Sequence, residues 1–385
     1  MRPRRGSDGI FALMSGGGTA GHVQPALAVG EALVARGHAP SSIVFVGSRR
    51  GMESTLVPEA GFEVCLLPGR GIQRKLTAAN FGAVGSLLLA CVLAVFLVAR
   101  RRPRVVVTVG GYAGLPGAVA AITLRVPLIV VSYDAVPGTS NRLVARFARK
   151  CAVAFESTGL PNQVVTGAPV RSAVVSADRS ASGRQAARSL IGVPAGRFLL
   201  AMAGGSLGAG RVNEATLSLA KAWAERSDVT IYHVAGERNM VEVSAAAVSL
   251  GLGPAPEGTG LDYRLVGYEK NMPALLAACD LLVSRAGAST VAELAAIGTP
   301  SVLVPLPGAP HDHQTRNAEA LTGLGAALLL RDADCSAVRL QEIVDSLMAD
   351  PARLAAMASA AATAGHSDAA DKVAELAESV VEAAR

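Results

Sequence analysis

The sequence predicts an α/β protein made of two doubly wound units, each built on a parallel sheet. Short apolar runs rich in β-branched residues alternate with helical segments along the chain, which is typical of sheets that helices cover on both faces. A glycine-rich turn follows the first such run at Gly16, and the same layout restarts around Gly204. A length of 385 residues is sufficient for two domains.

The first unit opens with an expected strand at residues 10–14, followed by the glycine turn and a helix over about 24–35 that ends before Gly37. Residues 43–46, 105–109, 128–131 and 151–155 are further buried-strand candidates. Residues 81–99 contain no charge and precede "RRRPR". Their length permits a membrane span. Internal glycines and the strand that follows favour a partly exposed helix on the sheet that dips into the bilayer interface.

The pattern restarts after "GAPVR" (167–171), with strands expected at 198–203, 230–233, 261–266, 281–284 and 301–305. We therefore predict an N-terminal domain over 1–166, a second over 167–366, and a closing helix over 367–385 that packs back on the first domain. Doubly wound sheets bind ligands at the carboxyl ends of their strands. The expected site is a cleft between two such domains facing each other.

Charge is unevenly distributed between the two halves. Residues 1–166 carry 18 Lys and Arg against 7 Asp and Glu, whereas residues 167–385 carry 18 against 23. The first half therefore faces an anionic partner. Aromatic residues make up 4% and no nucleic-acid-binding module is present, so a membrane surface is favoured over nucleic acid. Five scattered cysteines fit a reducing cytosol and form neither a disulfide framework nor a zinc site.

The stretch "SGGGTAGHVQP" (15–25) matches a dinucleotide-binding fingerprint only in part. That fingerprint needs an acidic residue at the end of the second strand to hold a ribose, and Gly47 and Ser48 stand there. His22 follows the last glycine at a helix start, where the positive helix end favours a neutral imidazole. His22 is therefore either a base facing the cleft or a residue that packs at the helix start.

The second unit carries a candidate anion site at 287–290, where exposed backbone N–H groups suit a diphosphate. Glu293 has two interpretations, and the spacing from Thr290 favours the first: a capping box, or a carboxylate for ribose hydroxyls. Ser206 is likewise either a helix-start hydroxyl or a phosphate ligand. His311, Asp312 and His313 lie close together, but their spacing does not favour a metal site. Gln314 opens a helix at the cleft edge, where an amide can bind sugar hydroxyls.

Seven segments resemble, in order, motifs of the MurG family, the bacterial UDP-N-acetylglucosamine–N-acetylmuramyl-(pentapeptide) pyrophosphoryl-undecaprenol N-acetylglucosaminyltransferases. They are "GGGTAGHVQPALAVG", "GGYAGLPGAVAA", "AVPGTSNRLVARFA", "TGAPVR", "GGSLGAGRVNEA", "SRAGASTVAELAAIGTPSVLVPLP" and "HDHQTRNAEAL". The resemblance implies a GT-B-type fold of two Rossmann-like domains facing across a cleft. It implies inverting transfer of N-acetylglucosamine from UDP-N-acetylglucosamine to lipid I in peptidoglycan synthesis, at the cytoplasmic face of the cell membrane, by a peripheral enzyme without cofactor or metal.

The resemblance also implies roles for single residues. On the acceptor side it places Thr19, Ala20 and Gly21 at the diphosphate and His22, as the base, at the reacting hydroxyl. On the donor side it assigns Arg171 and Ser206 to the diphosphate or nearby nucleotide groups. It assigns backbone contacts to Ala288, Ser289, Thr290 and Val291, the ribose to Glu293, and the sugar to Gln314.

Three cleft positions depart from the family pattern. Where the family usually carries His-Glu-Gln-Asn, this chain has "VSYD". Asp134, which we expect to bind substrate, takes the place of the asparagine. Leu207 replaces a glutamine and Ala20 a glycine. These departures leave open a different lipid-linked acceptor or a non-catalytic nucleotide-sugar-binding homologue. A sugar-nucleotide epimerase is a further alternative.

Overall fold

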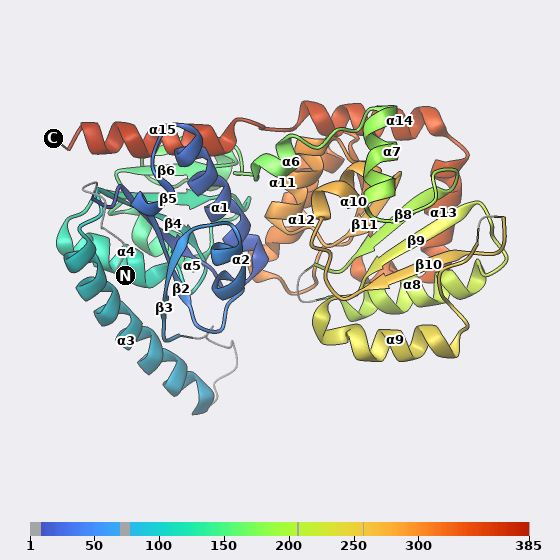
Figure 1. Cartoon of the computed structure of the whole chain (residues 1–385), viewed down its shortest axis with the longest axis horizontal. Helices are drawn as coiled ribbons and strands as arrows, with labels where there is room; N and C mark the ends of the chain where they lie inside the picture. Colours follow the sequence, from blue (N-terminus) through green and yellow to red (C-terminus); the bar gives the residue numbers. More distant parts are fainter. Residues whose placement is uncertain (1–8, 70–77, 206–207, 257, 385) are drawn as a thin grey trace, which may run out of the picture. The chain divides into compact units, whose positions relative to one another are not determined.

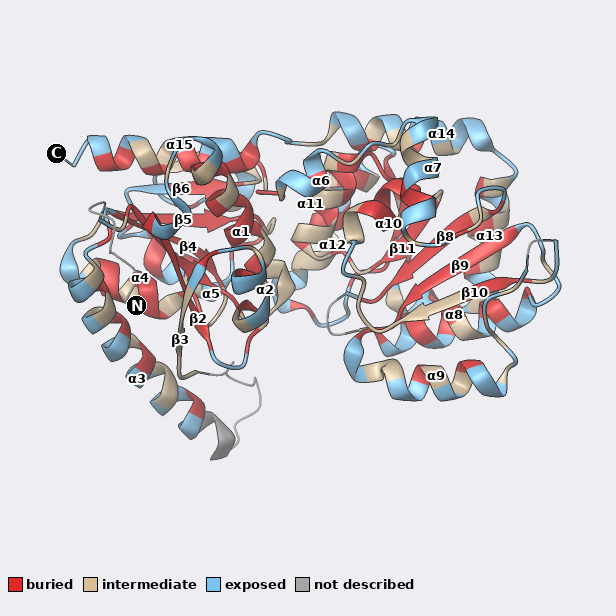
Figure 2. Ribbon diagram, viewed as in Figure 1, coloured by how far each residue is buried: buried red, intermediate tan, exposed pale blue. Residues whose placement is uncertain are grey.

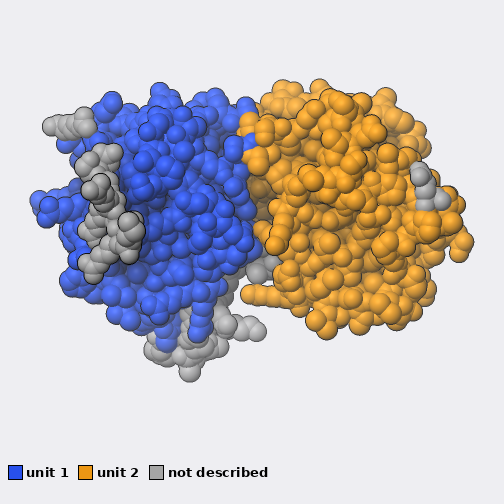
Figure 3. All heavy atoms as spheres, in the orientation of Figure 1, with its two compact units in different colours: residues 1–172, 366–385 blue, residues 173–365 orange. Residues whose placement is uncertain are grey.

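A computed structural model describes residues 9–69, 78–205, 208–256 and 258–384. The chain forms two compact units (Figure 3): residues 1–172 together with 366–385, and residues 173–365. Residues 167–172, where the sequence analysis opened the second domain, lie in the first unit. The guanidinium of Arg171 and the backbone N–H of Ser172 both donate to the carboxylate of Glu31, which ties this segment to the first unit.

The first unit is built on a seven-stranded sheet in which all strands are parallel, in the order β3-β2-β1-β4-β5-β6-β7. Its strands are β1 (Ala12–Gly16), β2 (Ile43–Ser48), β3 (Glu63–Leu67), β4 (Val105–Gly110), β5 (Leu128–Ser132), β6 (Lys150–Val153) and β7 (Gln163–Val165). The central strands β1, β2, β4 and β5 are buried along their whole length (Figure 2). Helices therefore cover both faces of this sheet.

Helices α3 and α4 form one layer over this sheet, and α1 packs with α15 in another (Figure 1). The helices of this unit are α1 (Ala20–Ala35), α2 (Glu53–Glu59), α3 (Ala78–Arg101), α4 (Leu115–Leu124), α5 (Thr139–Ala145) and α15 (Ala369–Glu382). The carboxylate of Glu378 on α15 pairs with the side chains of Arg36 and His38 after α1. The last helix of the chain is thus an integral part of the first unit.

The second unit repeats the same arrangement with six parallel strands in the order β10-β9-β8-β11-β12-β13. These strands are β8 (Phe198–Ala203), β9 (Val229–Val234), β10 (Asp262–Val266), β11 (Leu281–Ser284), β12 (Ser301–Leu303) and β13 (Ala327–Leu329). Its helices are α6 (Ser172–Val175), α7 (Ala181–Leu190), α8 (Gly210–Ala222), α9 (Met240–Ser249), α10 (Met272–Ala278), α11 (Ala288–Ile297), α12 (His313–Thr322), α13 (Ala337–Met348) and α14 (Pro351–Thr363). Both sheets have the strand order of dinucleotide-binding folds, so the predicted fold class is confirmed.

The sequence analysis identified the strands of both sheets, including the outer strand β10, with three exceptions. Strands β3, β7 and β13 were missed, and each is short and partly exposed. An outer strand carries a weaker run of apolar residues because part of its surface faces water. Helix α1 also begins at Ala20, four residues before the expected start, because the helix forms directly out of the glycine turn.

Candidate active site

In the first unit the carboxyl ends of β1, β4 and β5 bring the glycine-rich turns to one edge of the sheet. Strand β1 ends at Gly16, and α1 begins four residues later with Thr19 as its N-cap residue. Strand β4 ends at Gly110, which precedes Gly111 and Tyr112. This is the edge at which doubly wound sheets bind their ligands.

His22 lies in the first turn of α1, and its ring faces the turn that follows β4. Its ring nitrogen Nδ1 is 3.2 Å from the hydroxyl of Thr19. A methyl group added at Gly111 would come within 3.4 Å of the ring, so the ring packs directly on this backbone. The backbone N–H of His22 donates to the carbonyl of Thr19. The structure therefore brings Thr19, Ala20, Gly21 and His22 together at one helix start, with the imidazole held by a hydroxyl.

Two tyrosines that sequence reasoning missed also line this edge. A methyl group added at Gly18 would come within 2.7 Å of the Tyr112 ring, which therefore lies against the glycine turn. The buried Tyr133 donates its hydroxyl to the carbonyl of Gly21 at 2.8 Å. Tyr112 could have been found from the motif "GGY", whereas the Tyr133 contact spans 112 residues and has no local signal.

The segment "VSYD" places two unlike groups at the end of β5. Burial, and to a smaller extent the charge of Asp134, raise the pKa of Tyr133 well above its ordinary value, so its hydroxyl keeps the proton that it donates. Asp134 itself is partly exposed. Near the same strand end, the buried atoms Ser132 Oγ and Asn141 Oδ1 have no hydrogen-bond partner among the described residues, although Asn141 donates to the carbonyl of Val131.

Arg171 is held within the first unit. Its guanidinium pairs with the carboxylate of Glu31, at 2.5 Å from Nη2, and also contacts the amide oxygen of Gln24. The hydroxyl of Ser172 donates to the same carboxylate at 3.0 Å. A role for Arg171 at a donor diphosphate would require it to share or exchange this partner.

In the second unit the carboxyl end of β11 leads directly into α11. This helix begins at Ala288, with Gly287 as its N-cap residue. Ala288, Ser289 and Thr290 thus form its first turn, where backbone N–H groups and the helix dipole favour an anion. The backbone N–H of Val291 already donates to the carbonyl of Gly287, so any contact from this residue comes from its side chain.

The capping box predicted from Thr290 and Glu293 is wrong. The N-cap residue is Gly287, so Thr290 does not occupy that position. Thr290 lies inside the first turn because the helix begins earlier than the spacing suggested. Glu293 is consequently not used as a cap, and burial raises the pKa of its carboxyl group to about 7. This carboxyl group lies one turn inside the helix start and is close to half-ionised at neutral pH.

Gln314 lies in the first turn of α12, near the carboxyl end of β12. Its amide oxygen accepts a hydrogen bond from the backbone N–H of Leu306 at 2.9 Å, so the group that it offers to a ligand is its N–H donor. His311 and Asp312, just before this helix, both have left-handed backbone angles, with φ of 52° and 53°. The carboxylate of Asp312 accepts from the hydroxyl of Thr315. This strained turn fixes the start of α12.

Ser206 and Leu207 lie outside the described residues. Across the parts of the chain that the structure describes, no three His, Cys, Asp or Glu side chains are grouped so that they could hold a metal ion.

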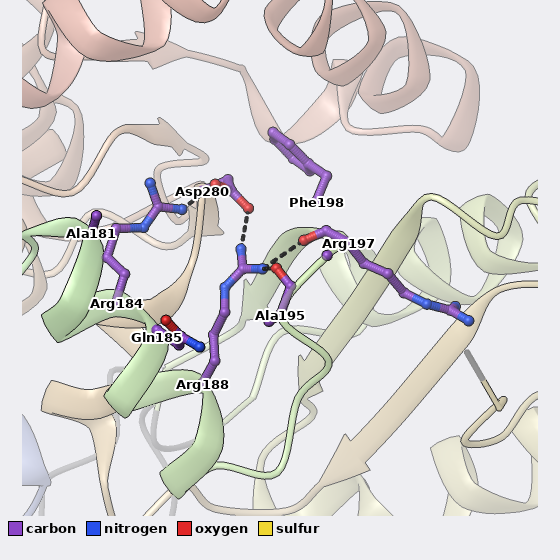
Figure 4. A pocket seen from close by; sticks show the side chains of 9 residues that line it. Ala181, Arg184, Gln185, Arg188, Ala195, Arg197, Phe198 and Asp280 are labelled. Carbon is purple, nitrogen blue, oxygen red and sulfur yellow. Dashed lines mark hydrogen bonds and ion pairs between the residues drawn. The ribbon is translucent and has the colours of Figure 1, made fainter. Parts of the chain in front are cut away.

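A cavity of about 590 Å³ lies at the opposite edge of the second sheet, where β8 begins (Figure 4). Two of its arginines, Arg184 and Arg188, both pair with Asp280. Arg188 also donates to the carbonyls of Ala195 and Arg197. This cavity is lined by a structural network and is separate from the ligand-binding edge.

Two Rossmann-like units, each with a glycine-rich turn and a helix start at its ligand-binding edge, define the class of nucleotide-sugar glycosyltransferases with the GT-B fold. Two family models match the chain: the glycosyltransferase family 28 N-terminal domain over residues 12–153 and the family 28 C-terminal domain over residues 199–373. The chain belongs to the family of UDP-N-acetylglucosamine–N-acetylmuramyl-(pentapeptide) pyrophosphoryl-undecaprenol N-acetylglucosamine transferases, the MurG family.

Curated relatives with this name match the chain over nearly its full length. The protein from Acidothermus cellulolyticus is 40% identical over 98% of this chain and 99% of its own. The protein from Desulforudis audaxviator is 35% identical over 95% and 97%. The crystal structure of Acinetobacter baumannii MurG superposes with a TM-score of 0.69 at 27% identity, covering 97% of this chain and all of that one. The predicted family and enzyme class are confirmed.

Proposed function

We propose that this protein transfers N-acetylglucosamine from UDP-N-acetylglucosamine to lipid I, the polyprenyl-diphosphate-linked N-acetylmuramoyl-pentapeptide, and so forms lipid II. The full-length similarity to transferases of that name carries the proposal. The two ligand-binding edges support it: the acceptor belongs to the first unit and the donor to the second.

On the acceptor side, His22 is the proposed general base. It accepts the proton of the attacking sugar hydroxyl as the new bond to the anomeric carbon forms and the bond to the UDP oxygen breaks. The hydroxyl of Thr19, 3.2 Å from Nδ1, orients the ring. The start of α1 at Ala20 and Gly21 suits the acceptor diphosphate, because helix N-termini bind anions.

On the donor side, the first turn of α11 stabilises the negative charge that develops on the departing UDP. Glu293 accepts hydrogen bonds from the ribose hydroxyls, and Gln314 donates from its amide to the sugar. Attack from the face opposite to the leaving UDP inverts the anomeric centre.

The test is transfer from labelled UDP-N-acetylglucosamine to a lipid I analogue in detergent. The His22→Ala variant should lose about 10²- to 10⁴-fold in rate. His38→Ala is a matched control, because this histidine of the same unit pairs with Glu378 and not with the site. Absence of lipid II formation by the wild-type protein would contradict the proposal. UDP release without any acceptor would instead indicate epimerase-like chemistry.

A second candidate function keeps the donor and changes the lipid-linked acceptor. Tyr133 and Asp134 motivate it, because an anion at the end of β5 disfavours a second anion nearby. A panel of polyprenyl-linked acceptors separates the two functions. A clear preference for lipid I would exclude this alternative.

We further propose peripheral attachment at the cytoplasmic face of the membrane through α3. Of the helices in the described residues, only Gly82–Arg101 is long and apolar enough to cross a membrane, by length and composition alone. Small residues of α3, including Ala90 and Ala94, are buried, while large residues such as Leu88 and Phe96 are 63% and 69% exposed. Arg100 and Arg101 end the helix. An exposed apolar face with a basic end fits an anionic lipid surface.

A further inference from the structure

Glu53 is a buried carboxyl group at the start of α2. Only 1% of its surface is exposed. No Lys, Arg or His nitrogen of the described residues lies within ion-pair distance of it. A buried carboxylate is normally stable only where hydrogen bonds or charges compensate the loss of water, so its partners indicate its role.

Those partners are the backbone N–H groups of two loops at the carboxyl edge of the first sheet. Oε2 accepts from the backbone N–H of Gly18, in the glycine turn after β1, at 2.8 Å. Oε1 accepts from the backbone N–H of Ser48, at the end of β2, at 2.5 Å. One side chain thus fastens the glycine turn to the neighbouring strand end.

Three glycines make room for this carboxyl group. A methyl group added at Gly17 would lie 2.4 Å from Cδ of Glu53, one at Gly47 would lie 2.2 Å from Cγ, and one at Gly51 would lie 2.0 Å from Oε2. Such distances are impossible for real side chains. The glycines at these positions are therefore explained by Glu53.

The fastened turn leads directly to the proposed acceptor site. Gly17 and Gly18 have φ of 150° and 97°. On its other side the turn lies against Tyr112. The next residue, Thr19, contacts the imidazole of His22. A shift of the Gly18 peptide plane would therefore move the N-cap of α1 and the ring that depends on it.

We propose that Glu53 is a positioning residue for the acceptor half of the transfer reaction, fixing the 16–18 turn and thereby Thr19 and His22. The inference rests on the proposed function. It also explains why the glycine turn is not a dinucleotide site: in such a site an acidic residue beside this strand end holds a ribose, whereas here the chain's own carboxylate binds the loop amides.

The test measures steady-state kinetics of Glu53→Gln with both substrates varied. The glutamine amide places an N–H against one of the two backbone N–H donors, so the glycine turn at 16–18 should shift. We expect kcat/KM for the lipid I analogue to fall by about 10- to 100-fold, the loss that misplacement of about 1 Å produces. The KM for UDP-N-acetylglucosamine should stay within about twofold, because the donor binds the other unit.

Asp262→Asn is the matched control. Asp262 is a fully buried carboxylate of the second unit that likewise accepts from a backbone N–H, that of Ala255. This control should lower stability without a selective loss toward the acceptor. If Glu53→Gln does not fold, Gly51→Ala provides the same test, because its methyl group displaces the carboxylate while Glu53 is retained.

A double variant removes the carboxylate of Glu53 and refills part of its volume. Gly47→Ala with Glu53→Ala removes the overlap, so it should fold yet keep the acceptor defect. Wild-type kinetics in Glu53→Gln, or a parallel loss toward donor and acceptor, would overturn the proposal. Absence of transfer by the wild-type protein would instead overturn the proposed function. Calorimetry of donor binding measures the second unit separately, so the two failures can be distinguished.

Discussion

Glu293, which we propose binds the ribose, is largely shielded from water. Burial raises its pKa to about 7, so the folded protein holds the neutral form over a pH range in which an unfolded chain is ionised. A carboxylate accepts two ribose hydrogen bonds better than a neutral carboxyl group does. We therefore predict that the KM for UDP-N-acetylglucosamine rises as the pH falls below about 7, measured by initial rates between pH 5.5 and 8.5.

The Glu293→Gln variant gives the matching control. Its KM should be higher than that of the wild type at pH 8 and should not change with pH in this range. Because the folded pKa lies above the unfolded one, the stabilising contribution is complete below about pH 4.5 and is lost as the pH rises through 7. The variant should consequently be more stable than the wild type at pH 8, by about 1 to 3 kcal/mol, in denaturant unfolding. Equal stability would contradict this account.

His233 makes stability depend on pH in the opposite direction from Glu293. It is fully buried in the second sheet, with Nε2 3.0 Å from the amide oxygen of Asn213 and Nδ1 2.8 Å from the hydroxyl of Tyr263. Because an amide oxygen only accepts, Nε2 carries the proton and the neutral ring is satisfied. Burial lowers the pKa to about 4.

This burial predicts acid sensitivity of the second unit. Below pH 6.5 the unfolded chain binds a proton that the folded His233 does not, so stability is lost as the pH falls from 6.5 to 4, by on the order of 3 kcal/mol. Urea unfolding at several pH values measures this loss. The His233→Gln variant should be less stable overall but should have a shallower pH dependence over that range; identical slopes would refute the assignment.

At the scale of the element, α3 reverses the usual pattern of a surface helix. Its buried stripe consists of Ala83, Ala90, Ala94 and Val98, each 1% exposed, and its large apolar residues face outward. Small residues allow the helix to pack closely on α4. The exposure of these large apolar residues is the basis of the proposed attachment to lipid.

We predict that Phe96→Glu and Leu88→Glu reduce binding to anionic phospholipid vesicles by at least about tenfold, because each removes buried apolar area and adds repulsion. Co-sedimentation with vesicles of phosphatidylglycerol measures the effect. Val241→Glu is the control, since this residue is 84% exposed on α9 of the second unit. Equal loss in the control would show that the effect is not specific to α3.

At the scale of the whole molecule, the chain passes between the units twice, near residues 172 and 365. The last helix, α15, completes the first unit through Val373, Ala374 and Ala377, which are fully buried. The first unit therefore cannot finish folding until the second has been synthesised. Each unit is stabilised by a hydrophobic core of its own.

We predict two separable thermal transitions. Val373→Ala should lower the free energy of unfolding of the first unit by about 2 kcal/mol. The second unit should still be stabilised by UDP, by about 2.7 kcal/mol when UDP is present at 100 times its Kd. Val344→Ala, at a fully buried position of α13, should do the reverse. Calorimetry with and without UDP measures both effects, and a single transition lowered equally by the two variants would contradict the prediction.

The sequence by itself determined the two doubly wound units and the residues at their glycine turns and helix starts. Buried parallel strands are continuous apolar runs, and glycine turns are local signals, so both can be found without tertiary information. The family resemblance added the donor and acceptor. Outer strands β3, β7 and β13 escaped, because partial exposure weakens the apolar pattern.

Only the tertiary structure decided how distant groups meet. The pairing of Arg171 with Glu31, the contact of Tyr133 with Gly21 and the burial of Glu293 all depend on neighbours far along the chain. Glu53 is the clearest case. The sequence around it is that of an ordinary turn, and only folding brings its carboxylate to the backbone N–H groups of Gly18 and Ser48. Local spacing determines which groups are present, whereas hydrogen bonding and desolvation depend on what surrounds them in space.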